Sequence, residues 1–282
     1  MKYELLAIDV DGTLTGADNT ISPEVAEAVA AADAAGLRIV LATGRSYVET
    51  IPIWRRLNLG LPHEPMILIG GAMVSEPDTG RTLYQRAIRR DLACRYADAL
   101  GEAGYSALAI VDAWRHGVDY FVAESDDAEI IHRRWFSRMN VKVRRLHRLD
   151  EADDMPDPLR INAVVDAENA PALAKTLKLR FAGQLNIHAI FAPNYDVTIV
   201  EAFAAGTDKW KALKYVAGAY RIGPGRIVAI GDDINDLPMI RHAGLGVATA
   251  LAPPQVKTAA KHVAADGVAD FLHRLITDKL PA

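Results

Sequence analysis

Residues 5–14 of the chain read Leu-Leu-Ala-Ile-Asp-Val-Asp-Gly-Thr-Leu, and this stretch decides the fold. Its four leading apolar residues show no polar alternation, which is typical of a parallel strand that is buried on both faces. Asp9 and Asp11 follow where the strand ends, and residues at i and i+2 of an extended chain point to the same side. Ligands of open parallel sheets bind beyond the carboxyl ends of the strands. The stretch therefore predicts an α/β sheet with two carboxylates at its ligand-binding edge.

Strand and helix patterns alternate after this stretch. A helix is predicted from Ser22-Pro23 to Gly36, a strand over 37–42, a helix opened by the capping box of Ser46 and Glu49, and a strand over 66–69. Short links between such elements indicate a parallel sheet with right-handed crossovers.

The same alternation returns near the C-terminus. We expect a helix capped by Thr207 that runs to about 219, a strand over 226–230, a helix over 235–243, a strand over 245–248 and a closing amphipathic helix from Val268. The middle of the chain, 81–192, carries strand candidates of its own between helical stretches. We therefore predict that 1–80 and 193–282 fold together around an inserted domain.

Composition limits the classes of protein that need consideration. The 282 residues are 50% hydrophobic and 24% charged, which is a globular composition. The net charge of −4 argues against a globally basic nucleic-acid binder. Cys94 is the single cysteine, which fits a reducing compartment. No stretch reaches the roughly 18 apolar residues of a membrane span. We expect a cytoplasmic protein that binds neither membrane nor nucleic acid.

A second acidic cluster, Gly-Asp-Asp-Ile-Asn-Asp at 231–236, follows the predicted strand over 226–230. If this strand neighbours the one before Asp9, the two sets of carboxylates converge. Close carboxylates repel each other unless a cation or a shared proton relieves them, and Mg²⁺ is the first candidate for oxygen ligands. The alternative interpretation is structural, with turn aspartates at one strand end and helix-capping aspartates at the other.

Two further features suit an anion. Thr43-Gly44-Arg45 ends the second predicted strand, where a glycine lets backbone N–H groups approach an anion and the threonine offers a hydroxyl. Lys209 lies in the first turn of a predicted helix, where a cation costs about 0.3–1 kcal/mol unless an anion binds there. A plain turn and a solvated lysine are the alternatives.

These four features occur together in the order of a known family. The chain resembles the haloacid dehalogenase superfamily of phosphohydrolases, specifically the Cof-like group (subfamily IIB). The residues that carry the likeness are Asp9-x-Asp11-Gly12-Thr13, Thr43-Gly44-Arg45, Lys209, Gly231-Asp232-x-x-Asn235-Asp236, Gly244-Leu245-Gly246-Val247-Ala248 and Asp266-Gly267-Val268. The resemblance implies a three-layer, doubly wound parallel sheet with an inserted α/β cap domain, which corresponds to 81–192.

Three positions depart from the family pattern. Gly70-Gly71-Ala72 stands where the family usually has Asn-Gly-Ala, Trp210 follows the lysine where a glycine is usual, and Leu251-Ala252 replaces an Asn-Ala step. None of them touches the acidic residues, so the departures bear on substrate preference.

The resemblance implies a Mg²⁺-dependent phosphatase, a phosphoric monoester hydrolase that acts on a small phosphorylated metabolite such as a sugar phosphate. Asp9 would be the nucleophile that forms an aspartyl-phosphate, and Asp11 the acid and base. The implied roles of the other residues are as follows: Asp9, the backbone carbonyl of Asp11, and Asp232 hold Mg²⁺; Thr43, Gly44 and Lys209 bind phosphate; Asn235 contacts phosphate or orients Lys209; Asp236 supports the metal waters or the lysine; Asp233 stays outside the primary set.

Other functions remain open from the sequence. The alternatives are a phosphomutase of the same fold, a nucleotide-sugar-dependent glycosyltransferase and a non-catalytic metabolite-binding protein. We expect the chain to be a monomer or a homodimer. A dinucleotide enzyme is disfavoured because the first strand leads into Asp9 and not into a glycine-rich loop. The basic stretch over 132–148 is interpreted as a solvated face paired with Asp150, Glu151, Asp153 and Asp154, with an anionic substrate or nucleic acid as alternatives.

Overall fold

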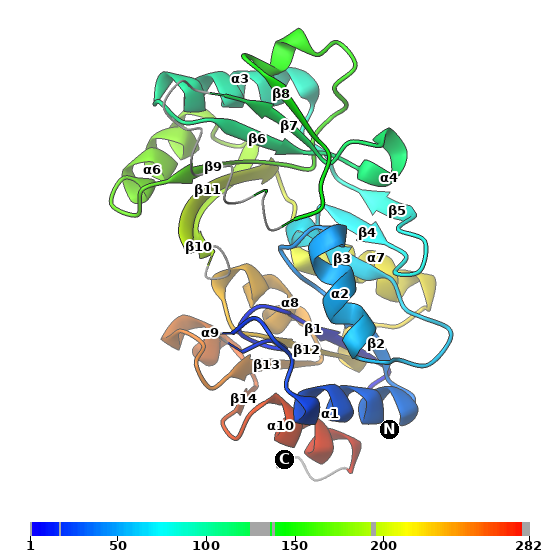
Figure 1. The fold of residues 1–282 in the computed structure, drawn as a ribbon. Coiled ribbons are helices and arrows are strands. Elements are labelled where there is room, and N and C mark those ends of the chain that lie inside the picture. Colours follow the sequence, from blue (N-terminus) through cyan, green and yellow to red (C-terminus); the bar gives the residue numbers. More distant parts are fainter. Residues whose placement is uncertain (1, 17, 125–135, 137–138, 193–195, 278–282) are drawn as a thin grey trace. The chain divides into compact units, whose positions relative to one another are not determined.

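The computed structural model describes residues 2–16, 18–124, 136, 139–192 and 196–277. It divides the chain into two compact units (Figure 1). The first unit consists of Met1–Tyr84 and Asp208–Ala282, and the second of Gln85–Thr207. The first unit contains two sheets and the second unit one, and each unit has its own apolar core and is described by itself below.

The main sheet of the first unit has five parallel strands in the order β14-β13-β12-β1-β2. Its strands are β1 (Leu5–Ile8), β2 (Arg38–Leu41), β12 (Ile227–Gly231), β13 (Leu245–Thr249) and β14 (His262–Ala264). From β1 the chain first adds β2 on one side and later adds β12, β13 and β14 on the other. The strand order therefore reverses between β1 and β12, which is where open α/β sheets bind their ligands.

Helices cover both faces of this sheet, so the predicted three-layer architecture is confirmed (Figure 1). Leu5 and Ala7 of β1 pack with Leu213 and Met239 from two helices on one face. Leu6 and Ile8 alternate to the other face and are fully buried. The helices of the unit are α1 (Pro23–Ala34), α2 (Tyr47–Arg56), α7 (Lys209–Ala219), α8 (Leu237–His242), α9 (Pro254–Ala259), α10 (Val268–Ile276) and the 3₁₀ turns η1 (Ile69–Gly71), η3 (Pro224–Arg226) and η4 (Ile234–Asp236).

The strand predicted over 66–69 does not extend the parallel sheet as expected. It forms β3 (Met66–Leu68), which pairs antiparallel with β4 (Met73–Ser75) in a separate sheet completed by β5 (Thr82–Gln85). A single parallel bridge, Ala42 to Ile67, connects it to the end of β2. The chain reverses at η1 directly after β3, and this reversal favours the antiparallel partner.

The second unit is an α/β domain built on a six-stranded sheet in the order β10-β11-β9-β6-β7-β8. All neighbours are antiparallel except β7 and β8. Tyr96 and Leu177 from two helices pack with Ile161 and Ala163 on one face of the sheet. The elements are α3 (Arg90–Glu102), β6 (Ala107–Ile110), α4 (Ala113–His116), β7 (Tyr120–Ala123), β8 (Val143–Leu146), η2 (Leu149–Glu151), β9 (Arg160–Val165), α6 (Ala170–Arg180), β10 (Leu185–Ala192) and β11 (Val197–Ala204).

The boundaries of the units differ from the predicted ones. The sequence predicts 80/81 and 192/193, whereas the structure divides the chain at 84/85 and 207/208. The reason is strand pairing, because β5 belongs to the small sheet of the first unit and β11 pairs with β9 and β10 in the second.

Two predicted helix starts are also corrected. Asp208, not Thr207, is the N-cap of α7, because its carboxylate accepts a hydrogen bond from the Lys211 N–H at 2.8 Å. The helix predicted over 235–243 is divided into η4 and α8. Asp233 caps η4, and a proline in the first turn opens α8.

Charge pairing accounts for Arg144, Arg145 and Arg148 of the basic stretch. Residues 132–135 and 137–138 of that stretch lie outside the described residues. Arg144 contacts Asp154 at 2.6 Å and Arg148 contacts Asp150 at 2.9 Å, so these predicted partners are confirmed. Arg145 pairs with Glu124.

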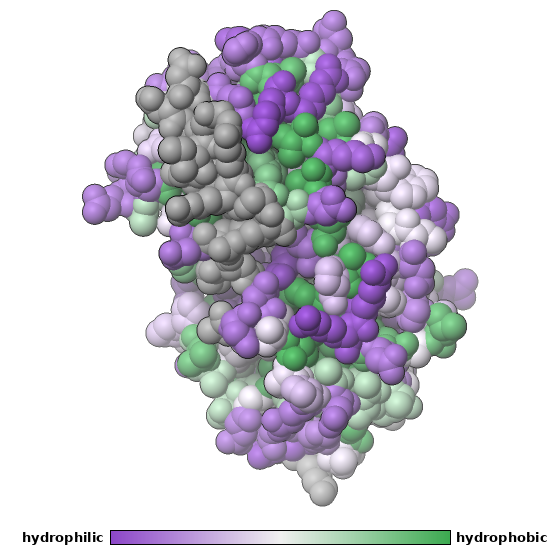
Figure 2. All heavy atoms as spheres, in the orientation of Figure 1, coloured by the Kyte–Doolittle hydropathy of each residue, from purple (hydrophilic) through white to green (hydrophobic). Residues whose placement is uncertain are grey.

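Hydrophilic residues surround scattered apolar ones on the face shown in Figure 2. Among the described residues, the helices are all too short or too polar to cross a membrane.

Gly246→Ala is expected to lower the free energy of unfolding by about 1–3 kcal/mol. A Cβ atom at Gly246 in β13 would lie 1.9 Å from the carbonyl oxygen of Ile240 in α8. The matched control is Gly218→Ala in α7, where a Cβ atom meets nothing within 4 Å and alanine favours the helix by up to about 1 kcal/mol. Urea unfolding measures both. A Gly246→Ala protein as stable as the wild type would contradict the close packing of α8 on β13.

Candidate active site

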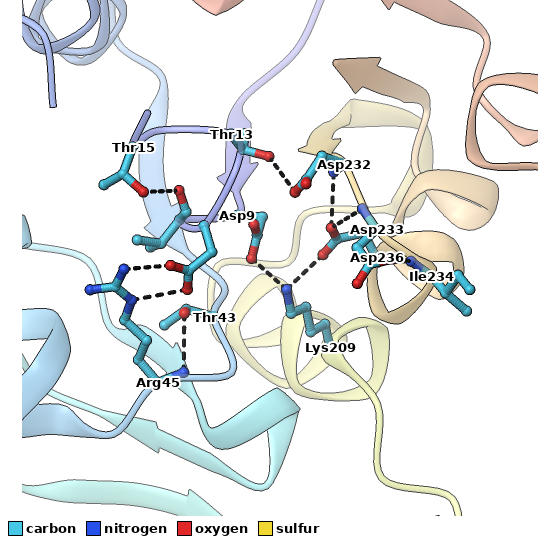
Figure 3. Close-up of polar contacts among 12 residues, drawn as sticks. Asp9, Thr13, Thr15, Thr43, Arg45, Lys209, Asp232, Asp233, Ile234 and Asp236 are labelled. Atoms are coloured by element: carbon cyan, nitrogen blue, oxygen red, sulfur yellow. Dashed lines mark hydrogen bonds and ion pairs between the residues drawn. The ribbon is translucent and has the colours of Figure 1, made fainter. Parts of the chain in front are cut away.

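The carboxylates of Asp9 and Asp232 meet at the carboxyl ends of neighbouring strands β1 and β12 (Figure 3). The backbone N–H of Asp9 donates to the carbonyl of Ile230 at 3.0 Å, so the ladder continues to the residue that carries the carboxylate. The hydroxyl of Thr13 donates to Oδ1 of Asp232 at 3.1 Å. A Cβ atom on Gly12 would lie 2.3 Å from Oδ2 of Asp232. The turn after β1 thus needs glycine to admit this carboxylate.

Lys209 lies between two of the acidic residues (Figure 3). Its Nζ donates to Oδ1 of Asp9 and to Oδ1 of Asp236, both at 2.6 Å, and its side chain is 1% exposed. It is the first residue of α7, where the helix dipole disfavours a cation. The two carboxylates compensate for that position.

Asp236 is held from two further directions. Its Oδ2 accepts hydrogen bonds from the backbone N–H groups of Asp232 and Asp233, at 3.0 and 3.1 Å. A Cβ atom on Gly231 would lie 2.4 Å from the carboxyl carbon of Asp236. Asp236 is fully buried. Its hydrogen bonds orient Lys209 and fix the turn after β12.

Burial and mutual repulsion shift the charges of this cluster. Burial, and then the charges of Asp236 and Asp232, raise the pKa of Asp9 well above its ordinary value, although Lys209 opposes the shift. Burial and the charge of Asp236 raise the pKa of Asp232 to about 6. Burial lowers the pKa of Lys209, but the charges of Asp236 and Asp9 outweigh it and leave the pKa raised. The cluster holds more negative charge than its single lysine neutralises.

The donor set fits a hard divalent cation. Carboxylate oxygens of Asp9, Asp232 and Asp236 all lie within 4.8 Å of one another. The Asp236 oxygens already accept from Lys209 and from two backbone N–H groups, which leaves Asp9 and Asp232 as the better ligands. Oxygen ligands and an excess of negative charge are what Mg²⁺ and Ca²⁺ prefer.

The loop Thr43-Gly44-Arg45 follows β2 at the same edge of the sheet (Figure 3). Its backbone is held by η1, because the N–H groups of Gly70 and Ile69 donate to the carbonyls of Thr43 and Arg45, both at 2.9 Å. Thr43 is fully buried and its hydroxyl accepts from the Arg45 N–H at 3.1 Å. A Cβ atom on Gly44 would meet nothing within 4 Å, so this residue borders open space.

The η1 turn runs through left-handed backbone conformations, which suit its two glycines. Gly70 and Gly71 have φ values of 63° and 95°, and even Ile69 has a φ of 52°. A Cβ atom on Gly71 would lie 2.3 Å from the carbonyl oxygen of Asp208, directly before Lys209. Gly70, one of the departures from the family pattern, therefore lies in a turn that connects the Thr43 loop with the start of α7.

The other two departures lie in different surroundings. Trp210 is buried in the apolar cluster of the first unit and stacks on His242 of α8, with ring centroids 5.6 Å apart. It is therefore a core residue beside Lys209. Leu251 is 93% exposed on the loop after β13.

The side chains of Asp11 and Asn235 have different surroundings. The carboxylate of Asp11 is bound by the guanidinium of Arg45, with Nε to Oδ2 at 2.9 Å. Asn235 is exposed in η4, and within the described part of the chain its side chain makes no hydrogen bond to Lys209. Asp233 caps η4 by accepting from the Ile234 N–H at 2.7 Å.

Two residues of the site have no role in the sequence-based prediction. Thr13 orients Asp232, and Arg45 holds Asp11. Both residues belong to the motifs quoted from the sequence, which could have marked them as part of the site. The partner of each side chain depends on the loop geometry and could not be predicted from the motif.

Known proteins resemble this chain over nearly its whole length. The haloacid dehalogenase-like hydrolase family matches residues 6–272. A 5-amino-6-(5-phospho-D-ribitylamino)uracil phosphatase of Bacillus subtilis is 28% identical over 96% of this chain and 97% of its own. A pyridoxal phosphate phosphatase of Escherichia coli is 26% identical over 99% of this chain and 100% of its own. The solved structure of a HAD subclass IIB sugar phosphatase has a TM-score of 0.75 at 22% identity, covering 96% of this chain and 98% of that one.

The chain belongs to the haloacid dehalogenase-like hydrolase family. Its relatives place it among the phosphatases of that family, which are phosphoric monoester hydrolases. The predicted family, fold class and class of enzyme are confirmed.

Without divalent cations, Asp232→Asn is expected to raise the free energy of unfolding at pH 7.5. At that pH the folded protein carries the Asp232 carboxylate against burial and the charge of Asp236, a cost that the unfolded chain lacks. A shift of the pKa from 3.8 to about 6 corresponds to a gain on the order of 1–2 kcal/mol after screening by solvent.

The gain in the free energy of unfolding should shrink as the pH falls through 6 towards 4. In that range the Asp232 carboxyl of the folded wild type becomes protonated, so the wild type no longer bears the cost of a buried charge. Urea unfolding in EDTA at pH 7.5 and pH 5 measures it, with exposed Asp153→Asn as the matched control. An equal effect at both pH values would contradict the electrostatic explanation.

Proposed function

We propose that the protein is a Mg²⁺-dependent phosphatase that hydrolyses a small phosphorylated metabolite through an aspartyl-phosphate on Asp9. The observation that carries the proposal is the placement of Asp9, which a strand ladder and Lys209 fix beside Asp232. A nucleophilic carboxylate next to a cation site and a buried ammonium is suited to attack on a phosphoryl group.

Asp9, Asp232 and the backbone carbonyl of Asp11 would hold Mg²⁺ in this proposal. When bound, the ion would offset the repulsion between carboxylates and phosphate and would stabilise negative charge in the transition state. Asp236 would keep its contact with Lys209 and would support the site from behind.

In the first step, an Oδ atom of Asp9 forms a bond to phosphorus. The bond from phosphorus to the oxygen of the leaving group breaks, its electron pair stays on that oxygen, and Asp11 supplies the proton that makes the free alcohol. In the second step a water oxygen bonds to phosphorus, Asp11 takes a proton from that water, and the bond from phosphorus to Asp9 breaks. Asp9 is thereby regenerated and phosphate is released.

The remaining polar groups would bind the phosphoryl oxygens. Lys209 supplies a buried positive charge, and Gly44 borders open space at the same edge of the sheet. Thr43 would add its hydroxyl and Asn235 its exposed amide. Such donors, fixed before the reaction, stabilise charge that develops in the transition state.

The substrate class rests on the relatives and on the second unit. Two relatives are named for phosphorylated small metabolites and one solved structure for sugar phosphates. We propose a sugar phosphate or a similar small metabolite, with the domain at Gln85–Thr207 as the part that selects the organic group. The partner would be this metabolite alone, in the cytoplasm that the lone Cys94 favours.

Asp9→Asn is expected to abolish release of phosphate from an aryl phosphate, with a loss of at least about 10⁴-fold, because the amide cannot form the covalent intermediate. Colorimetric phosphate release with Mg²⁺ measures it, and a metabolite panel then ranks substrates. The exposed residue Asp78→Asn serves as the control. Retained activity in Asp9→Asn would refute the nucleophile, and product isomerised faster than phosphate is released would indicate a phosphomutase.

Addition of Mg²⁺ at pH 7.5 is expected to raise the melting temperature and to restore activity after EDTA treatment. At a concentration 100 times the dissociation constant, binding to the folded state adds about 2.7 kcal/mol. The stabilisation should weaken below pH 6, where protonation of Asp232 competes with the ion, and it should be lost in Asp232→Asn. Full activity in EDTA would contradict the metal requirement.

A further inference from the structure

Arg45 and Asp11, which is two residues after Asp9, form a two-point ion pair beside the proposed reaction centre. Nε of Arg45 donates to Oδ2 of Asp11 at 2.9 Å, and Nη2 donates to Oδ1. The same Nη2 also donates to the side-chain oxygen of Asn19. Arg45 is 9% exposed and the side chain of Asp11 is 34% exposed, so the pair lies at the border between the interior and solvent.

The guanidinium starts from a fixed point. The Arg45 N–H donates to the hydroxyl of Thr43 at 3.1 Å, and the Arg45 carbonyl accepts from the Ile69 N–H at 2.9 Å. At the guanidinium end of the side chain, Nη2 donates to the side-chain oxygen of Asn19. Asn19 lies in a turn, where its own N–H donates to the Gly16 carbonyl at 3.0 Å. A planar guanidinium bound at both ends dictates the plane of the carboxylate that it grips.

Asp11 itself lies in a turn that fixes its backbone and leaves the direction of its side chain to other contacts. The N–H groups of Leu14 and Thr15 converge on the Val10 carbonyl, at 3.0 and 2.9 Å. A partly exposed aspartate in a turn can adopt several rotamers, and the fork of Arg45 selects one of them.

We propose that Arg45 is a positioning residue for Asp11, and that Asn19 in turn positions Arg45. The pair holds the Asp11 side chain in one orientation. In that orientation the protonated carboxyl group gives its proton to the leaving oxygen, and the carboxylate that results, which the guanidinium stabilises, takes a proton from water in the second step. This inference rests on the proposed acid–base role of Asp11. Direct binding of the phosphate by Arg45 is disfavoured, because Nε and Nη2 are both engaged by side chains of the protein.

The test compares two leaving groups in a double-mutant cycle. Glycerol 2-phosphate needs a proton on its leaving oxygen, whereas 2,4-dinitrophenyl phosphate does not. We measure kcat/KM, which reports the steps up to formation of the aspartyl-phosphate. Arg45→Ala should lower it by about 10- to 100-fold for the alkyl phosphate, with a far smaller loss for the aryl phosphate. Asp11→Asn should show the same pattern with a larger loss, about 100- to 10,000-fold.

The combined variant, Arg45→Ala with Asp11→Asn, should be no slower than Asp11→Asn alone, because Arg45 acts only through Asp11. Arg45→Lys keeps the charge but not the two-point grip, so it should remain well below the wild type on the alkyl phosphate. Added guanidinium should partly rescue Arg45→Ala. Arg81→Ala, which breaks a similar two-point pair with Glu76, is the control and should leave both rates unchanged.

Several outcomes would overturn the inference. Equal losses for both substrates, or losses that multiply in the combined variant, would assign Arg45 to phosphate binding. A faster Arg45→Ala enzyme would mean that the pair holds Asp11 away from the reaction. An Arg45→Lys enzyme with full activity on the alkyl phosphate would also overturn the inference. The melting temperature of each variant shows whether a loss of activity comes from misfolding. If Asp11→Asn itself leaves the alkyl phosphate rate unchanged, the acid–base role fails; if Asp11→Asn is slow and Arg45→Ala is not, only the role of Arg45 fails.

Discussion

The site in the first unit depends on the repulsion among three neighbouring carboxylates, of which two are buried and one is half-buried. Asp9, Asp232 and Asp236 approach one another at the ends of two neighbouring strands, where burial makes their charges expensive. Lys209 relieves part of that cost from the start of α7. Lys209 does not neutralise all of the negative charge of the three carboxylates. The remaining negative charge suits the site to a divalent cation and to a phosphoryl group held by that cation.

The surrounding glycines and turns follow from the need to bring these groups so close. Gly12 and Gly231 each border a carboxylate at distances that no side chain allows. Gly71 admits the backbone at the start of α7, and the same η1 turn holds the Thr43 loop through two backbone hydrogen bonds. The four motifs are thus one connected structure, in which each loop fixes the position of another.

Much of the fold could be predicted because it is local or nearly so. The apolar run of β1, the N-cap Ser22 and the capping box of Ser46 and Glu49 carry their own physical signals and match the structure. The predictions failed where pairing partners decide. β3 joined an antiparallel sheet, and β11 joined the second unit, because a strand pattern does not state which strand lies next to it.

The sequence by itself determined which chemical groups the site contains: two acidic clusters, a lysine at a helix start and a glycine-containing loop, in the order of one family of hydrolases. Only the tertiary structure decided which side chains touch. It paired Lys209 with Asp236 and not with Asn235, gave Asp232 its hydrogen bond from Thr13, and directed Asp11 to Arg45. The physical reason is range, since propensities and caps act over a few residues, whereas these contacts join loops that only the assembled sheet brings within hydrogen-bond distance.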